Sequence, residues 1–141
     1  MLKIIAIAAT ERLLHNAGDF ALQNSFLANN KRQSWAIAFL HSLIYSIPFV
    51  LFYLWNPWNP LEWADVWKEV VIVGTHTVID RLNLGAFWVR LYNQDWEDWR
   101  ISKPSAPFWV AIAIDQWQHQ VCNLVTLCWG EDWSQLFKLL A

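Results

Sequence analysis

Hydrophobic residues are concentrated in four long stretches of the chain, and each stretch predicts a helix. The clearest one covers residues 35–55, which carry no formal charge and have a tryptophan at each end. At about 1.5 Å per residue, a helix of this length covers roughly the 30 Å hydrocarbon core of a bilayer. Pro48 inside the stretch predicts a kink. We therefore expect residues 35–55 to span a membrane; the alternative is the buried core helix of a soluble protein.

The other three stretches contain more polar residues and predict helices that are shielded from lipid by their neighbours. They cover residues 2–28, 62–80 and 108–129. Two short amphipathic pieces, residues 84–91 and 133–140, are expected at the membrane surface. The predicted fold is all-α, a compact helical membrane bundle of about four helices that forms a single domain over residues 1–141.

The composition also favours a membrane. Hydrophobic residues make up 56% of the chain and charged residues 16%, so the protein is more apolar and less charged than most soluble domains. Twelve tryptophans in 141 residues favour a bilayer interface, where a side chain is apolar at one end and hydrated at the other. A formal net charge of −2 without a basic stripe argues against nucleic-acid binding. The expected partner is therefore the lipid bilayer, with no nucleic acid.

Lysine and arginine predict how the helices are oriented. Basic side chains occur at Lys31 and Arg32 and in the connection over residues 81–107. Residues 56–65 and 130–132 contain no lysine or arginine. Basic loops stay on the cytoplasmic side of a membrane. We therefore expect the basic connections to face the cytoplasm.

All four histidines lie in the apolar stretches, and three of them have an aspartate four residues away. The pairs are His15 with Asp19, His76 with Asp80, and Asp115 with His119, while His41 stands alone in the predicted span. Residues four apart share one face of a helix, so the two side chains of a pair can reach the same point. Ionisable groups are costly in lipid, so these are expected to face partners inside the bundle.

The depths of these residues along their helices agree. His41 lies roughly 9 Å into its predicted helix, and the pair that begins with Asp115 lies roughly 10–17 Å into its own. Asp19 lies roughly 13 Å from the end of its helix, and the pair that begins with His76 lies within about one turn of the cytoplasmic end. All of them fall in the cytoplasmic half of the bundle, which predicts one shared site.

A metal site is the chemistry that this pattern favours. Imidazole and carboxylate groups bind zinc, iron and manganese, and two donors spaced one turn apart on a helix are a common arrangement. Seven donors exceed one tetrahedral site, so we expect one or two divalent ions, zinc first and iron or manganese as alternatives. The predicted ligands are His15, Asp19, His41, His76, Asp80, Asp115 and His119. The residues expected to orient them by hydrogen bonds are Asn16, Gln23, Ser42, Thr75, Gln116 and Asn123.

The predicted function follows from the metal. A divalent ion with an open coordination position activates water for the hydrolysis of esters and phosphoesters. We therefore expect a metal-dependent hydrolase that acts at the membrane on a lipid head group or another phosphoester or ester, with His41 and Asp115 as catalytic residues. Two alternatives are a non-catalytic membrane protein, such as a phage-encoded modulator of the host envelope whose polar groups fix helix packing, and a small ion or proton pathway. The nearly apolar far half of the bundle counts against the pathway.

The same residues resemble a family of small bacterial and phage membrane proteins that is catalogued as a domain of unknown function. The resemblance covers about residues 13–119 and implies the inner membrane of a bacterium or of a phage-infected host. The family is in turn similar to membrane-bound metal-dependent hydrolases. It commonly has two histidines where this chain has only His41, which weakens the case for two ions. The H-x-x-G-D-F-x-x-Q motif is matched by His15, Gly18, Asp19, Phe20 and Gln23, and later elements by Asn30 with Lys31, His76 with Ile79 and Asp80, and Asp115 with Gln116 and His119.

Overall fold

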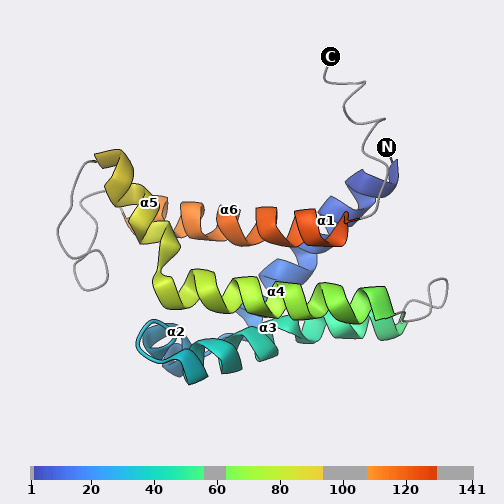
Figure 1. Ribbon diagram of the computed structural model, residues 1–141, viewed down its shortest axis with the longest axis horizontal. Coiled ribbons are helices and arrows are strands. Elements are labelled where there is room, and N and C mark those ends of the chain that lie inside the picture. The colour runs from blue at the N-terminus through green and yellow to red at the C-terminus, as the bar shows by residue number, and fades with distance from the viewer. Residues whose placement is uncertain (1, 56–62, 94–107, 130–141) are drawn as a thin grey trace, which may run out of the picture.

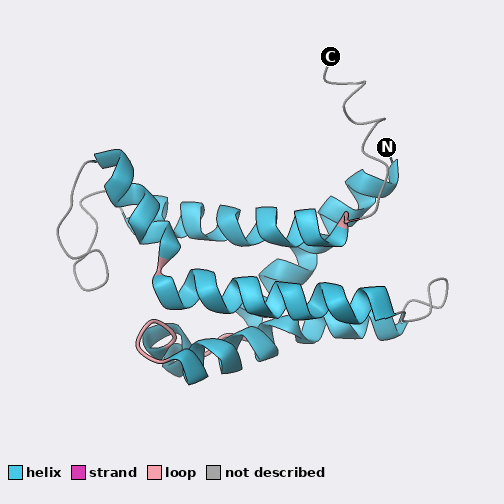
Figure 2. Cartoon of the chain, in the orientation of Figure 1, coloured by secondary structure: helices cyan, strands magenta, loops and turns pink. Residues whose placement is uncertain are grey.

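The computed structural model describes residues 2–55, 63–93 and 108–129. These ranges are helical and contain no strand, which confirms the predicted all-α class for the described part of the chain (Figure 2). The elements are α1 (Leu2–Asn16), the π-helix η1 (Ala17–Ala21), α2 (Ser25–Asn30), α3 (Trp35–Trp55), α4 (Trp63–Leu82), α5 (Leu84–Asn93) and α6 (Phe108–Leu127). The predicted helix over residues 133–140 lies outside the described residues.

The helix α4 is the central element of the bundle. It packs against α3 on one side and against α6 on the other, and Figure 1 shows the three helices stacked side by side. The helix α1 crosses behind them and contacts both α6 and α3. The four long helices therefore surround a common interior, which α4 lines along its length.

The helix α3 begins and ends where the sequence predicted. Among the described residues it is the one helix that is long and apolar enough to cross a membrane. Only 33% of its apolar window is buried inside the protein, whereas a core helix of a soluble protein would be mostly buried. Its outer face exposes large side chains such as Phe39, Leu43 and Leu54, and its inner face buries His41 and Tyr45.

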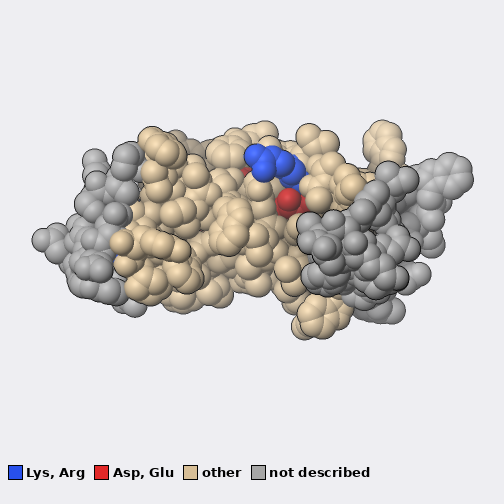
Figure 3. Space-filling view, turned by 90° about the horizontal axis from the view of Figure 1, so that it is seen from above, with Lys and Arg blue, Asp and Glu red and all other residues tan. Residues whose placement is uncertain are grey.

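Charged side chains are scarce on part of the protein surface. Figure 3 shows one face on which lysine, arginine, aspartate and glutamate atoms of the described residues gather in a single small patch. Seven tryptophans among the described residues are exposed. They are Trp35, Trp55, Trp67, Trp88, Trp109, Trp117 and Trp129.

The N-terminal segment differs from the single helix expected over residues 2–28. The α-helix ends at Asn16, the wider turn η1 follows, and a new helix begins after Asn24, whose side chain accepts a hydrogen bond from the Leu27 amide at 2.9 Å. Close packing against α3 accompanies the change. A Cβ atom built on Gly18 would lie 2.4 Å from the carbonyl oxygen of Tyr45. Gly18 therefore lets α3 approach closely, and the π-turn carries Asp19 into the interior.

The helix α5 covers one end of α6. Asn83, with a φ of 52°, separates α5 from α4, and asparagine tolerates this left-handed conformation better than most residues. A Cβ atom on Gly85 would lie 2.8 Å from Cβ of Asp115, so the glycine permits the contact between α5 and α6. The predicted amphipathic helix over residues 84–91 is therefore present, with Trp88 exposed and Val89 buried.

Candidate metal centre

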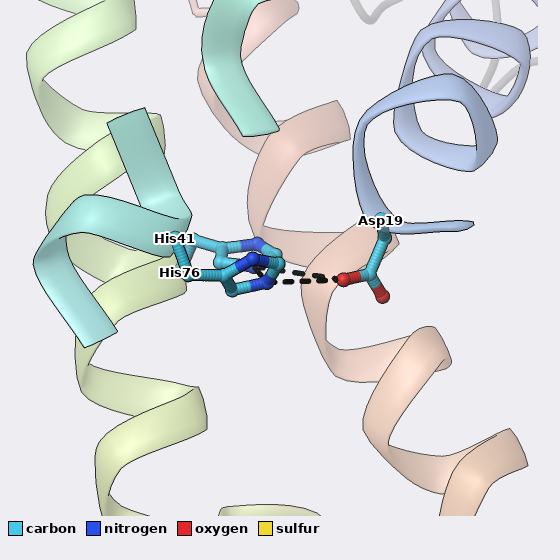
Figure 4. A group of neighbouring side chains, drawn as sticks. All are labelled: Asp19, His41 and His76. Atoms are coloured by element: carbon cyan, nitrogen blue, oxygen red, sulfur yellow. Dashed lines mark hydrogen bonds and ion pairs between the residues drawn. The ribbon is translucent and has the colours of Figure 1, made fainter. Parts of the chain in front are cut away.

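Five of the seven predicted ligands meet in the interior of the bundle. Each is almost fully buried, with at most 2% of its surface exposed. The donors fall into two groups that share His76, and within each group the donor atoms lie within 4.8 Å of one another. Figure 4 shows the first group, in which the imidazoles of α3 and α4 lie beside each other and face the carboxylate from η1. The groups are Asp19, His41 and His76, and His76, Asp80 and His119.

Three of the donor atoms form a nearly equilateral triangle. His41 Nε2 lies 3.1 Å from His76 Nε2 and 3.2 Å from Asp80 Oδ2, and the third side, His76 Nε2 to Asp80 Oδ2, is 3.1 Å. Metal–ligand bonds of about 2.0–2.2 Å place neighbouring donors roughly 3.0–3.5 Å apart in octahedral or tetrahedral coordination. The triangle therefore has the size of one face of a metal coordination shell.

A fourth donor, Asp19, stands beside this triangle. Its Oδ1 atom lies 3.2 Å from His41 Nε2 and 3.9 Å from His76 Nε2. Burial raises the pKa of Asp19, but the hydrogen bond to His41 and the positive charge of Lys31 outweigh it, so the pKa lies well below its usual range. Asp19 is therefore ionised at neutral pH, and a carboxylate is the form that binds a metal.

The imidazole of His119 is oriented by the backbone of its own helix. Its Nδ1 atom donates a hydrogen bond to the carbonyl oxygen of Asp115 at 2.9 Å. This leaves the unprotonated Nε2 atom 3.9 Å from Asp80 Oδ1, without a hydrogen-bond partner in the described part of the chain. A carbonyl on one ring nitrogen commonly fixes the other as a metal ligand. A buried polar atom without a partner is costly, so His119 is poised to bind a ligand.

His15 lies next to the centre but uses both ring nitrogens elsewhere. Nδ1 is 2.8 Å from the hydroxyl oxygen of Tyr45, and Nε2 is 2.7 Å from Oε1 of Gln116. Gln116 in turn donates a short hydrogen bond to Oδ2 of Asp19. In this geometry His15 acts on the centre through Gln116, which holds the Asp19 carboxylate.

Asp115 is also outside the two donor groups. Its Oδ2 atom lies 4.0 Å from Nδ1 of His119, the ring nitrogen that does not face Asp80. Its Cβ atom packs beside Gly85 of α5. The structure therefore brings together Asp19, His41, His76, Asp80 and His119, and leaves Asp115 behind His119. The predicted catalytic roles of His41 and Asp115 stay predictions.

Of the six predicted orienting residues, Gln116 hydrogen bonds to predicted ligands, because it joins His15 to Asp19. The amide of Asn123 instead donates to the hydroxyl of Tyr45 at 2.6 Å and to Glu11 at 2.9 Å. Ser42 and Thr75 instead donate hydrogen bonds to carbonyl oxygens of their own helices.

Sequence reasoning missed the positions of Lys31 and Tyr45. The sequence placed Lys31 in a basic connection that faces the cytoplasm, yet its Nζ atom lies 2.8 Å from Asp80 Oδ1 and 3.4 Å from His41 Nε2. Its place in the Asn-Lys element of the resemblance was the one available signal. Tyr45 lies in an apolar run and carried no signal of its hydrogen bonds.

Comparison with known proteins gives a family without an assigned activity. Residues 10–138 match the family described as "Protein of unknown function (DUF3307)". No curated protein and no solved structure matches the chain. The matched range includes every predicted ligand, and it confirms the expectation of an uncharacterised family. The chain therefore belongs to the DUF3307 family.

Proposed function

We propose that this protein is a membrane-embedded metal-dependent hydrolase that acts on a lipid, phosphoester or ester. One observation carries the proposal: imidazoles and carboxylates from η1, α3, α4 and α6 converge at the spacing that a divalent ion requires. Zinc is the first choice because it accepts nitrogen and oxygen donors readily, and iron or manganese would suit the same donors.

The contacts of His41 Nε2 are explained better by a bound metal ion than by hydrogen bonds alone. A ring nitrogen takes part in one ordinary hydrogen bond, as donor or as acceptor. Yet His41 Nε2 has four polar atoms within 3.4 Å, from His76, Asp19, Asp80 and Lys31. A metal ion shared by His41, His76, Asp19 and Asp80 would use their lone pairs together, which hydrogen bonds alone do not achieve, whereas the Lys31 ammonium has no lone pair to contribute.

The residues of such a centre would have different roles. His41, His76 and Asp80 would hold the ion, with Asp19 and His119 as further donors on either side. A bound divalent ion lowers the pKa of a coordinated water and so supplies a nucleophile for hydrolysis. Gln116 fixes the Asp19 carboxylate beside His41.

The outer surface supports a place in the membrane. The helix α3 has the required length, its large apolar side chains point outward, and Trp35 and Trp55 mark its two ends. At the Trp35 end, the Arg81 guanidinium lies 5.3 Å from the indole ring and donates to the carbonyl oxygen of Arg32 at 2.9 Å. By the positive-inside rule, this basic end would face the cytoplasm of a bacterium or phage-infected host, beside lipid head groups.

Burial of the donors favours a second function. All five expose at most 2% of their surface. Structural metal sites are closed, whereas catalytic sites keep a position open for water and substrate. The alternative is therefore a non-catalytic membrane protein in which a metal, or the polar groups alone, holds η1, α3, α4 and α6 together.

The test is metal analysis of the full chain purified in detergent, with variants matched by residue type. His76→Gln and Asp80→Asn should lose the metal, because each removes a corner of the donor triangle. Glu11→Gln should keep it, because Glu11 lies outside the donor groups and accepts a hydrogen bond from Asn123. Hydrolysis of phospholipids and of nitrophenyl esters and phosphates is then measured on the wild type and on every variant.

The outcomes separate the two functions. Metal in the wild type together with hydrolysis that His76→Gln abolishes supports the hydrolase. Metal without hydrolysis of any probe supports the structural alternative. Wild-type protein that holds no zinc, iron or manganese after growth with these metals contradicts the metal centre itself.

A further inference from the structure

Lys31 lies inside the candidate metal centre. Only 7% of its surface is exposed, although it follows directly on the short surface helix α2. Its ammonium group lies 2.8 Å from Asp80 Oδ1, 3.9 Å from Asp19 Oδ1 and 3.4 Å from His41 Nε2. Lysine is rarely buried unless it is paired, so the pairing with these two carboxylates explains its position.

The two oxygens of Asp80 face different neighbours. Oδ2 belongs to the triangle with His41 and His76, at 3.2 Å and 3.1 Å. Oδ1 faces the Lys31 ammonium at 2.8 Å and the unpaired Nε2 of His119 at 3.9 Å. A carboxylate that bridges two cations uses one oxygen for each. Asp80 is therefore arranged as a bridge between a metal-sized position on Oδ2 and the ammonium on Oδ1.

The ammonium lies against carboxylate oxygens that a second metal ion could use. Its Nζ atom is 2.8 Å from Asp80 Oδ1 and 3.9 Å from Asp19 Oδ1, and His119 Nε2 lies 3.9 Å from the same oxygen of Asp80. Lys31 already places a positive charge at this point, and its buried side chain keeps the charge there. Like charges repel strongly at such distances in a buried site, so the ammonium disfavours a second ion and weakens the hold on the first.

We propose that Lys31 is the second cation of the centre. Its ammonium takes the position that a second divalent ion would occupy, so the centre binds one ion and holds it less tightly than the carboxylates alone would. This inference rests on the proposed metal centre. It gives the stoichiometry that the sequence left open between one and two ions.

The experiment measures metal binding by the full chain in detergent after chelator treatment. Zn²⁺ is titrated in competition with a fluorescent chelator, and Mn²⁺ in a parallel series. The key variant is Lys31→Met, which keeps an unbranched side chain one atom shorter and removes its charge. Lys31→Arg keeps the charge. Lys68→Met is the control for loss of a lysine elsewhere, because Lys68 pairs with Asp65 at 4.0 Å on the same helix as His76 but away from the centre.

The expected result is one equivalent of Zn²⁺ in the wild type and a dissociation constant about fivefold or more lower in Lys31→Met, because a neighbouring positive charge is gone. Lys31→Arg and Lys68→Met should bind like the wild type. Circular dichroism and size-exclusion profiles establish that each variant is folded. If Lys31→Met does not fold, Lys31→Gln provides the same measurement, because it also removes the charge and still hydrogen bonds to Asp80.

Other results overturn the inference in distinguishable ways. Two equivalents in the wild type, or an affinity of the uncharged variant that improves by less than about fivefold, contradict the role of Lys31 and leave the metal centre intact. In that case Lys31 would only stabilise the fold, and the variant would lower thermal stability without tightening metal binding. Absence of Zn²⁺ and Mn²⁺ binding in wild type and variants alike contradicts both this inference and the proposed function.

Discussion

Two buried polar regions meet where Gln116 donates a hydrogen bond to Asp19, and they are built in opposite ways. One is a polar network formed by Glu11, Asn123, Tyr45, His15 and Gln116, in which hydrogen bonds run from one member to the next. The other is the candidate metal centre, in which several donors crowd around single atoms and His119 Nε2 has no partner among the described residues. Satisfied networks fix a structure, whereas donors in excess point to a ligand. The comparison therefore separates side chains that support the structure around the site from side chains that would bind a metal ion.

The largest effect is expected where both regions depend on one close contact. Gly18→Ala places a Cβ atom 2.4 Å from the backbone oxygen of Tyr45, and backbone yields less easily than a side chain. The π-helix must then move away from α3, which disturbs Asp19 and the Tyr45 hydroxyl together. We expect a loss of about 3 kcal/mol in the free energy of unfolding and weaker metal binding. Thermal unfolding in detergent and metal titration measure the two effects.

Gly74→Ala is the matched control for this substitution. A Cβ atom on Gly74 meets nothing within 4 Å, so the change should be neutral or should stabilise α4 by up to about 1 kcal/mol through its higher helix propensity. Equal stability of the two alanine variants would show that η1 and α3 are not packed as closely as described.

The sequence predicted the centre best where a pair lies on one uninterrupted helix. His76 and Asp80 share a face of α4, and their donor atoms lie 3.1 Å apart. His15 and Asp19 were expected to behave in the same way. The π-turn between them changes the direction of the second residue, so they are joined through Gln116 instead. Helical spacing predicts a shared face only if the helix is regular, and nothing in the local pattern indicated the π-turn.

The fold likewise contains features that a local sequence pattern predicts and features that depend on tertiary packing. The bounds of α3 follow from an uncharged run between two tryptophans, which is a local signal and was predicted correctly. The position of Lys31 depends on the break before α2, which returns the chain to the interior. Such a contact is set by tertiary packing, and sequence spacing carries no record of it. The sequence therefore missed Lys31, because its contact with the centre depends on how neighbouring elements pack.

A smaller effect is expected from breaking the polar network in its middle. Tyr45→Phe removes the hydroxyl that lies 2.8 Å from His15 Nδ1 and 2.6 Å from Asn123 Nδ2. The unpaired partners should lower the free energy of unfolding by about 1–3 kcal/mol. All donor atoms of the centre remain, so metal should still bind at the wild-type stoichiometry. Thermal unfolding and metal analysis check both parts.

Tyr53→Phe, two turns further along α3, is the control for loss of a hydroxyl on the same helix. It should unfold like the wild type. Loss of the metal in Tyr45→Phe would contradict the separation of the two regions, because the network would then be needed for binding and not only for support.

The smallest effect concerns the far end of the polar network. Burial raises the pKa of Glu11 to about 7, although the hydrogen bond from Asn123 and the charge of Arg12 act in the opposite direction. An unfolded chain releases this proton near pH 4.5, so between these values the folded protein holds a proton that the unfolded chain has lost. Stability should therefore fall as the pH rises from about 4.5 to about 7 and then level off with respect to this group. Glu11→Gln removes the titration, so its melting temperature should fall less than that of the wild type between pH 5 and pH 8. The measurement is the melting temperature of both metal-free proteins as a function of pH. If the two melting temperatures change with pH by the same amount, Glu11 is ionised in the folded protein and the network includes a charge.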